Sequence, residues 1–279
     1  MSAPATLIAQ ISDLHVKPRG QLAYNRVDTA LALQRCVEQL NRFLPRPDLV
    51  VITGDLVDRP SADAYGHLME LLAPLEFPFV ATAGNHDGRA LLRATLARQP
   101  YATASGALNL AVAAGPLDIL LIDSSVPGKD YGKIDADTIT WLDAQLATSS
   151  TRPALVFLHH PPFAIGIEHM DVQNLRNADA LAVVLRSHDR ARLLAAGHVH
   201  RATLTMFAGI AATTCPAPNH AVALDLDARL PPSFNIEPAA FHLHAWFPGE
   251  RFGSVITHFV PIGEFDGPHP FFSAAGTLL

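Results

Sequence analysis

Carboxylate, amide and imidazole side chains recur at five points in the sequence, each directly after a short apolar run. Such runs are typical of buried strands. In an open α/β sheet, ligands bind outside the carboxyl ends of the strands, so we expect these polar groups to meet in one crevice. They are Asp13 and His15 after 7–11, Asp55 after 49–52, Asn85 and His86 after 79–82, His159 after 154–158, and His198 and His200 after 193–196.

Seven of these side chains form a donor set suited to metal ions. Mixed oxygen and nitrogen donors favour borderline divalent metals over Ca²⁺ or Mg²⁺, and the lack of a thiolate disfavours a structural zinc site. Seven ligands exceed the needs of one tetrahedral ion, whereas two ions sharing the Asp55 carboxylate would use them all. We therefore expect two metal ions, for which Fe, Mn, Zn and Co all suit the ligands. The seven are Asp13, His15, Asp55, Asn85, His159, His198 and His200.

Two metal ions in one site indicate phosphoryl chemistry. Ions about 3.5–4 Å apart can hold a hydroxide between them and clamp both the attacking and the leaving oxygen of an in-line displacement. Their charge also allows an acidic protein, with 20 Lys and Arg against 26 Asp and Glu, to bind a phosphate. Because the chain has no cluster of Lys and Arg, polymeric nucleic acid is not an expected partner.

Each of these motifs alone has a simpler explanation. Aspartate after a strand commonly forms a turn or caps a helix, and Asn85 beside Gly84 is a frequent turn signal. A single histidine at a strand end is usually solvated or hydrogen-bonded. The joint occurrence at five strand exits favours the metal site.

The elements that must position these groups alternate between strand and helix in the first part of the chain. Apolar periodicity predicts helices at 27–43, 62–74, about 88–98, 137–148 and 178–187, a loose hairpin at 101–116 and a buried strand at 117–123. After residue 202 the pattern becomes mostly β, with short strands at 203–207, 209–214 and 221–226 in a second sheet. This order predicts an α/β protein with a four-layer α/β/β/α sandwich.

The segment 229–233 has the composition of a linker and divides the chain into two expected parts. Residues 1–228 would form the catalytic domain, and residues 229–279 a C-terminal cap or oligomerisation segment. The second part is rich in aromatic residues, including Phe241, Trp246 and Phe259, and has alternating patches at 240–246 and 253–260. We expect it to pack over the mouth of the site or against a second subunit, which favours a homo-oligomer, either a dimer or higher.

The sequence also gives expectations for location and cysteine chemistry. The N-terminus lacks the charged and apolar regions of a signal peptide, and no apolar run has membrane-spanning length. We therefore expect a cytoplasmic protein with no membrane partner. Cys36 and Cys215 are too few for a disulfide framework, but one bond between them is compatible with the sequence.

Five motifs in this order resemble those of the calcineurin-like metallophosphoesterases. The similarity is closer to the bacterial class III cyclic nucleotide phosphodiesterases and glycerophosphodiesterases, and it covers roughly the first 225 residues. The motifs are Asp13-x-His15, Gly54-Asp55, Gly84-Asn85-His86-Asp87, His159, and Gly197-His198-x-His200, with Arg19-Gly20, Tyr24, Asp28, 122–125 and 159–162 similar to that branch.

The resemblance implies roles for individual residues. Asp13, His15 and His200 would bind one metal, Asn85, His159 and His198 the other, and Asp55 would bridge them. The resemblance assigns His86 to the phosphate, where it would also protonate or stabilise the leaving alkoxide, with Asp87 orienting it. Asn85, Tyr24 and Arg19 would also face the substrate, and His160 would lie behind the ligands.

The implied activity is metal-dependent hydrolysis of small phosphodiesters, either cyclic nucleotides or glycerophosphodiesters. Two alternatives remain open from the sequence: hydrolysis of nucleotide anhydrides, and a non-catalytic scaffold that binds proteins through the aromatic tail. The remaining histidines are expected to have no functional role, and surface display is the simplest explanation for the pair His242 and His244. These histidines are His67, His169, His188, His220, His242, His244, His258 and His269.

Overall fold

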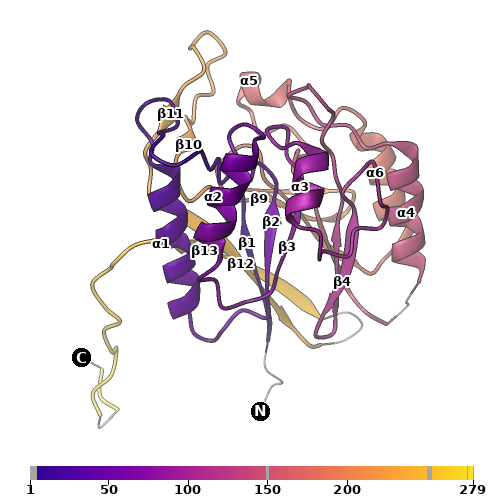
Figure 1. Ribbon diagram of the computed structural model, residues 1–279. Helices are drawn as coiled ribbons and strands as arrows, with labels where there is room; N and C mark the ends of the chain where they lie inside the picture. Colours follow the sequence, from indigo (N-terminus) through magenta and orange to yellow (C-terminus); the bar gives the residue numbers. More distant parts are fainter. Residues whose placement is uncertain (1–4, 149–150, 250–252, 275, 279) are drawn as a thin grey trace.

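The computed structural model describes residues 5–148, 151–249, 253–274 and 276–278, which form two packed β-sheets with helices on both outer faces (Figure 1). The first sheet has the strand order β13 (Ser254–Pro261), β12 (Ala240–Phe247), β1 (Thr6–Ile11), β2 (Leu49–Thr53) and β3 (Phe79–Thr82). The second has the order β4 (Leu110–Ala114), β5 (Leu117–Leu121), β6 (Ala154–Phe157), β7 (Ala191–Ala196), β9 (Ile210–Thr214) and β8 (Thr203–Phe207). The expected four-layer α/β/β/α sandwich is confirmed.

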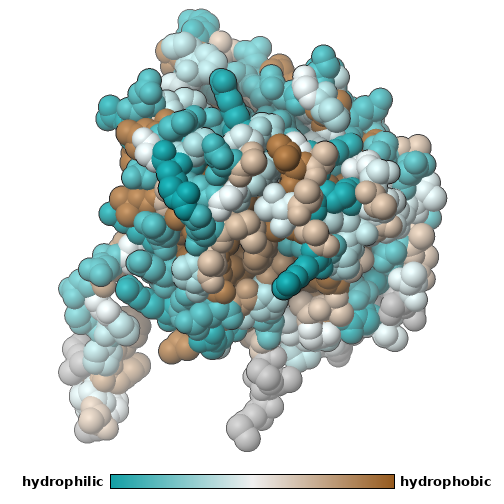
Figure 2. Space-filling model, in the orientation of Figure 1, coloured by the Kyte–Doolittle hydropathy of each residue, from teal (hydrophilic) through white to brown (hydrophobic). Residues whose placement is uncertain are grey.

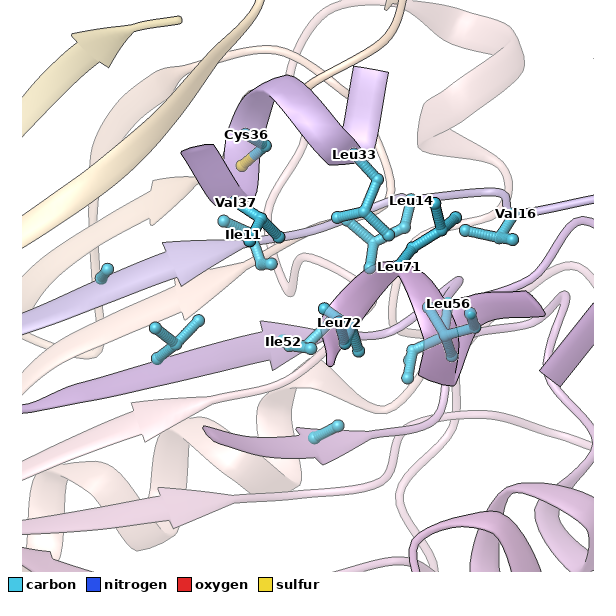
Figure 3. Close-up of a cluster of buried hydrophobic side chains, with 14 of the residues drawn as sticks. Ile11, Leu14, Val16, Leu33, Cys36, Val37, Ile52, Leu56, Leu71 and Leu72 are labelled. Atoms are coloured by element: carbon cyan, nitrogen blue, oxygen red, sulfur yellow. The ribbon is translucent and has the colours of Figure 1, made fainter. Parts of the chain in front are cut away.

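Alternation along the strands separates three layers of apolar side chains. Leu7 and Ile11 of β1 pack under α1 (Thr29–Arg42), α2 (Ala62–Leu72) and α3 (Arg89–Thr95). Figure 3 shows Val37 of α1 beside Ile11, and Leu33 of α1 beside Leu14. Ile8, between Leu7 and Ile11 in sequence, points the other way and packs against the second sheet. The outer face of that sheet is covered by α4 (Ala136–Ala147) and α6 (Ala178–Ser187).

Two helices begin where the sequence places a capping residue. The Asp28 side chain accepts a hydrogen bond from the Leu31 N–H at 2.9 Å, and the Ser61 hydroxyl accepts one from the Ala64 N–H at 3.1 Å. Some expected boundaries were too long, since α3 ends at Thr95 and only Ala221–Val222 of 221–226 form a strand, β10, which pairs with β11 (Phe234–Asn235). One short helix, α5 (Glu168–Asp171), was not predicted.

The strands that carry the polar groups are divided between the two sheets, rather than lying in one open sheet. Strands β1, β2 and β3 are mutually parallel in the first sheet, and β6 and β7 are parallel in the second. The candidate ligands lie at the carboxyl ends of these strands. They therefore meet where the ends of the two sheets approach each other.

The C-terminal strands β12 and β13 are built into the first sheet, so the patches at 240–246 and 253–260 do not pack over the mouth of the site. Another part of the expected segment 229–279, Pro232 to Phe234, does line a cavity beside His198 and His200. Strand β12 pairs antiparallel with β1, from Thr6 opposite Trp246 to Gln10 opposite His242. This pairing follows because β2 occupies one edge of β1 and leaves the other edge to be covered. His242 and His244 are consequently buried between the sheets, so our expectation of surface display was wrong. The division at residue 228 otherwise stays a prediction.

The residues after β13 run away from the body of the molecule (Figure 1), and they expose Phe265, Phe271 and Phe272. The face shown in Figure 2, which carries α1 to α3, is mainly hydrophilic with scattered apolar side chains. Cys36 and Cys215 are both buried free thiols, so the disulfide left open by the sequence does not form. In the part of the chain that the structure describes, every helix is too short or too polar to cross a bilayer.

If β12 belongs to the core of the catalytic unit, removing its largest apolar side chain will destabilise the whole protein. Phe241 is fully buried beneath α1, and its ring centroid lies 6.2 Å from that of Phe43. We expect Phe241→Ala to lower the free energy of unfolding by about 3–5 kcal/mol. Chemical denaturation measures this, with Phe259→Ala on β13, which is 50% exposed, as a control expected to lie within about 0.5 kcal/mol of wild type. Equal small effects would place β12 outside the core.

Candidate metal centre

The seven predicted ligands converge at the meeting point of the two sheets. His15 Nε2 lies 3.2 Å from His200 Nε2, and His200 Nε2 lies 3.5 Å from Asp13 Oδ1. On the other side, His159 Nε2 lies 3.0 Å from Asn85 Oδ1 and 3.3 Å from His198 Nδ1. These contacts form two groups, a first group of Asp13, His15 and His200 and a second group of Asn85, His159 and His198.

The Asp55 carboxylate connects the two groups. Its Oδ2 lies 3.6 Å from His15 Nε2 and 3.3 Å from His159 Nε2. Its Oδ1 accepts a hydrogen bond from the His86 N–H at 2.8 Å, so the orientation of the carboxylate is fixed by the backbone. Asp55 therefore has the position that the sequence predicted for a bridging ligand.

Hydrogen bonds on the far side of two rings direct the opposite nitrogen into the site. His159 Nδ1 donates to the Thr53 carbonyl at 2.8 Å, and His200 Nδ1 donates to the His220 carbonyl at 3.2 Å. In the neutral form that binds metals an imidazole carries only one N–H, so Nε2 of each ring then presents a lone pair. Lone pairs and carboxylate oxygens that face one another at 3.0–3.6 Å repel unless a cation lies among them, and outer hydrogen bonds of this kind are typical of histidines that bind metals.

The charge states of His198, His200 and Asp55 fit metal binding, whereas His159 is in a different state. Burial would lower the pKa of His159, but the Asp55 carboxylate outweighs it and raises that pKa to about 9. Burial lowers the pKa of His198 and of His200 well below the usual value, so both rings are neutral at pH 7. Burial alone would raise the pKa of Asp55, but His159 and His86 outweigh it and hold that pKa well below its usual value. Neutral imidazoles and an ionised carboxylate are the forms that bind metals.

The backbone at the ligands is held in a conformation that most residues avoid. Five of the seven predicted ligands have φ between +46° and +73°. Left-handed backbone at residues other than glycine is uncommon, and it concentrates at functional sites where the surrounding structure enforces it. The five are Asp13, His15, Asp55, His198 and His200.

Two glycines allow the strand ends to approach this closely. A Cβ atom on Gly84 would overlap a carboxylate oxygen of Asp55. A Cβ atom on Gly197 would overlap the Ser12 hydroxyl and lie 3.0 Å from Asp13 Oδ2. These glycines are therefore required by the packing of the ligands, and are not merely turn residues.

His160 lies beside the ligands but its ring is fully occupied elsewhere. Its Nδ1 is 2.9 Å from the Ser124 hydroxyl, and its Nε2 is 3.1 Å from the Asp130 carbonyl. With both ring nitrogens hydrogen-bonded, the imidazole has no free lone pair for a metal. This placement agrees with the position behind the ligands that the resemblance implied.

His86 is oriented by a different group from the one we expected. Its Nδ1 donates to the backbone carbonyl of Asp58 at 2.8 Å, which leaves Nε2 toward the pocket. Asp87 instead accepts hydrogen bonds from the Leu56 N–H at 3.2 Å, from the Gly84 N–H and from the Tyr65 hydroxyl. Its expected role in orienting His86 is corrected, because these donors fix its carboxylate within the 84–87 turn. Burial, together with the Asp55 charge, raises the pKa of Asp87 to about 6.

Positive charge at the site comes from residues outside the sequence motifs. A cavity of about 450 Å³ beside His86 is lined by Lys17 and Arg59. The Lys17 ammonium is 2.7 Å from Asp58 Oδ2. Arg19, which we expected to face the substrate, forms an exposed ion pair with Glu70 on α2 and lines neither cavity at the centre, because that carboxylate offers it a partner on the surface.

An aromatic cluster borders a second cavity of about 240 Å³ above the ligands. Tyr24 lies 4.9 Å from Phe234 and 5.3 Å from His220, measured between ring centroids. His220 in turn lies 4.5 Å from the His200 ring. We had assigned no role to His220 or Phe234, since neither follows a strand with the pattern of the other ligands. His169 also lines this cavity.

A shared carboxylate between two groups of metal-suited ligands, beside cavities with basic and aromatic residues, defines a hydrolase site for two metal ions. Residues 6–202 match the family described as calcineurin-like phosphoesterase. The chain belongs to this family, whose members use two metal ions.

Two curated relatives are similar over most of the chain. A probable glycerophosphodiester phosphodiesterase GpdQ from Arcobacter nitrofigilis is 38% identical over 98% of this chain and 99% of its own length. A 3',5'-cyclic adenosine monophosphate phosphodiesterase CpdA from Pseudomonas aeruginosa is 36% identical over 72% of this chain and 73% of its own. Among solved structures, a dimetal phosphatase from Danio rerio has the same fold, with a TM-score of 0.67 and 18% identity over 94% of this chain and all of that one.

The close approach of Gly84 to Asp55 predicts a site-specific loss. We expect Gly84→Ala to displace the Asp55 carboxylate and to lower the amount of metal bound per chain, as measured by elemental analysis after dialysis. Gly66→Ala is a matched control, because Gly66 lies within α2 with no heavy atom near its added Cβ. That variant should keep its metal and gain about 0.5–1 kcal/mol of stability. Full metal content in Gly84→Ala would show that the site tolerates the shift.

Proposed function

We propose that this chain hydrolyses small phosphodiesters at a centre of two metal ions. Asp13, His15 and His200 would hold one ion, Asn85, His159 and His198 would hold the other, and Asp55 would contribute to both. The observation that supports this most strongly is the single Asp55 oxygen within 3.6 Å of His15 Nε2 and 3.3 Å of His159 Nε2. When bound, the two ions would activate a water molecule and neutralise charge on the phosphate.

The chain's own residues supply the other steps. Lys17 and Arg59 attract the anionic substrate into the cavity beside His86. Nε2 of His86 faces the phosphate because Nδ1 is held by the Asp58 carbonyl. From this position the ring hydrogen-bonds to the phosphate and, when protonated, gives its proton to the leaving alkoxide. The aromatic cluster of Tyr24, His220 and Phe234 excludes water and packs against one ester group.

We propose glycerophosphodiesters as the first substrate class and cyclic nucleotides as the second. The relative named as a glycerophosphodiester phosphodiesterase matches nearly the whole chain, including 240–261, whereas the one named as a cyclic nucleotide enzyme covers about three quarters of it. Cyclic nucleotides stay a candidate because the exposed ring of Tyr24 borders both cavities and offers a surface on which a base can stack.

A non-catalytic scaffold is disfavoured, because all seven ligands are present and their donor atoms converge. The substrate panel described below distinguishes hydrolysis of phosphodiesters from hydrolysis of nucleotide anhydrides. We also propose a cytoplasmic location, from the sequence, and a homo-oligomer. The exposed Phe265, Phe271 and Phe272 support the oligomer, since they extend from the body where a second copy can cover them.

Metal removal is the first test of the proposed activity. Metal-stripped protein should not hydrolyse an activated aryl phosphodiester, and adding Mn²⁺ should restore turnover, because the water nucleophile depends on the ions. Asn85→Ala and His198→Ala should stay inactive after the same treatment. His188→Ala is the control, since His188 is paired with Asp143 at the surface. A panel of glycerophosphodiesters, cyclic nucleotides and nucleoside triphosphates then identifies the ester class, and preference for the triphosphates would refute our proposal.

Replacing His86 should separate catalysis from metal binding. We expect His86→Ala to lower kcat by about 10²–10⁴-fold, the usual contribution of a positioned general acid. Its metal content should stay at two ions per chain, measured by elemental analysis, because the ring is held by the Asp58 carbonyl. An aryl ester with a good leaving group should be less affected than an alkyl ester. Loss of metal in this variant would make His86 a ligand instead.

A further inference from the structure

A buried group of polar side chains lies between the two sheets, behind the metal centre and away from the substrate. Its members are Gln10 on β1, Thr53 on β2 and His244 on β12, and all three are completely inaccessible to solvent. Buried polar groups are costly unless they are hydrogen-bonded, so their presence in an apolar layer calls for an explanation. None of the three belongs to the proposed ligand set.

Gln10 is the centre of this group. Its side-chain amide donates to the Thr53 hydroxyl at 3.0 Å and to the Ala196 carbonyl at 3.1 Å. Thr53 is the last residue of β2 in the first sheet, and Ala196 is the last residue of β7 in the second. One side chain therefore connects the carboxyl ends of two strands that belong to different sheets.

The Ala196 carbonyl fixes every other orientation in the group. A carbonyl oxygen only accepts, so the amide nitrogen of Gln10 must face it, and Oε1 must point the other way. That oxygen lies 3.1 Å from His244 Nε2, which must then carry the ring proton. His244 Nδ1 consequently accepts from the Thr257 hydroxyl at 2.8 Å. Burial lowers the pKa of His244, which agrees with this neutral tautomer.

Both strand ends that Gln10 connects lead directly into the metal centre. The Thr53 carbonyl accepts the Nδ1 proton of His159, and Asp55 follows two residues later. Ala196 is followed by Gly197 and then His198. A Cβ on Gly197 would lie 3.0 Å from the Thr53 carbonyl, so these two strand ends are already at the limit of approach.

We propose that Gln10 and His244 are positioning residues for the metal centre. Gln10 fixes the spacing between the ends of β2 and β7, and with it the places of His159 and His198 relative to Asp55. His244, brought in by the C-terminal strand β12, holds the Gln10 amide in the required orientation. The group acts mainly on the second ligand group, because the orienting bond of the first group, from His200 to the His220 carbonyl, does not involve it.

A cobalt titration of metal-stripped protein tests this, with the visible absorption of bound Co²⁺ reporting each ion. Gln10→Leu keeps the size of the side chain and removes both donors. We expect one of the two Co²⁺ equivalents to bind about 10–100-fold more weakly, the usual effect of losing an outer hydrogen bond at a metal site, and the other to be unchanged. His244→Phe should weaken the same equivalent to a smaller extent.

His242→Phe is the matched control, because His242 is also buried on β12 and, in the described part of the chain, no side-chain hydrogen bond joins it to Gln10. It should leave both Co²⁺ affinities unchanged. Equal weakening of both equivalents, or unchanged affinities in a folded Gln10→Leu variant, would overturn the proposal. If Gln10→Leu does not fold, His244→Phe decides by the same comparison. Because binding is measured separately from turnover, an inactive wild type that binds two Co²⁺ would refute only the proposed function.

Discussion

The Asp55 carboxylate is the constraint on which the rest of the site depends. In the proposed centre this one carboxylate serves two metal ions, so ligands must reach it from two directions, and these directions come from two different β-sheets. His15 approaches from the first sheet and His159 from the second, within 3.6 Å and 3.3 Å of the same oxygen. The relative position of the sheets is therefore part of the chemistry, and the apolar layer between them has to hold that position.

Bringing these polar groups together at the ends of the two sheets has a cost in folding free energy. Carboxylates and imidazoles are buried together, and five of the ligands have left-handed backbone conformations. In a metal-free chain these terms oppose folding, so we expect bound ions to stabilise the folded state by mass action. The three apolar layers supply the remaining stability, because the core residues of β1 and β2 are almost all inaccessible to solvent.

The sequence predicted the parts of this structure that local patterns determine. Alternation and strand exits predicted the four layers and the seven side chains that converge, and the family resemblance selected His159 over His160. Each of these signals lies within a few residues. The pairing of β1 with β12 was not predictable in this way, because Thr6 and Trp246 are far apart in sequence. Alternation of apolar and polar residues identifies a strand but does not indicate which other strand pairs with it. The errors over His242 and His244 follow from this, since a strand without a known partner leaves both of its faces undetermined.

A second kind of error came from assigning partners by proximity in sequence. Asp87 is next to His86, yet the turn directs its carboxylate toward the Gly84 and Leu56 amides, and the His86 ring finds the Asp58 carbonyl instead. Phe234 packs against Tyr24 although more than two hundred residues separate them in the sequence, so proximity in the sequence did not identify this partner either.

The C-terminal strands are the clearest case of contacts that the sequence motifs do not reveal. The family match ends at residue 202, whereas the hydrogen bonds behind the candidate metal centre include His244 on β12. The segment most remote from the motifs in sequence is thus in contact with the residue that connects the two sheets. A catalytic unit that ended before β12 would leave one edge of β1 unpaired and the Oε1 atom of Gln10 without its donor. The hydrogen bonds behind the proposed site therefore extend to a strand in which no motif was visible.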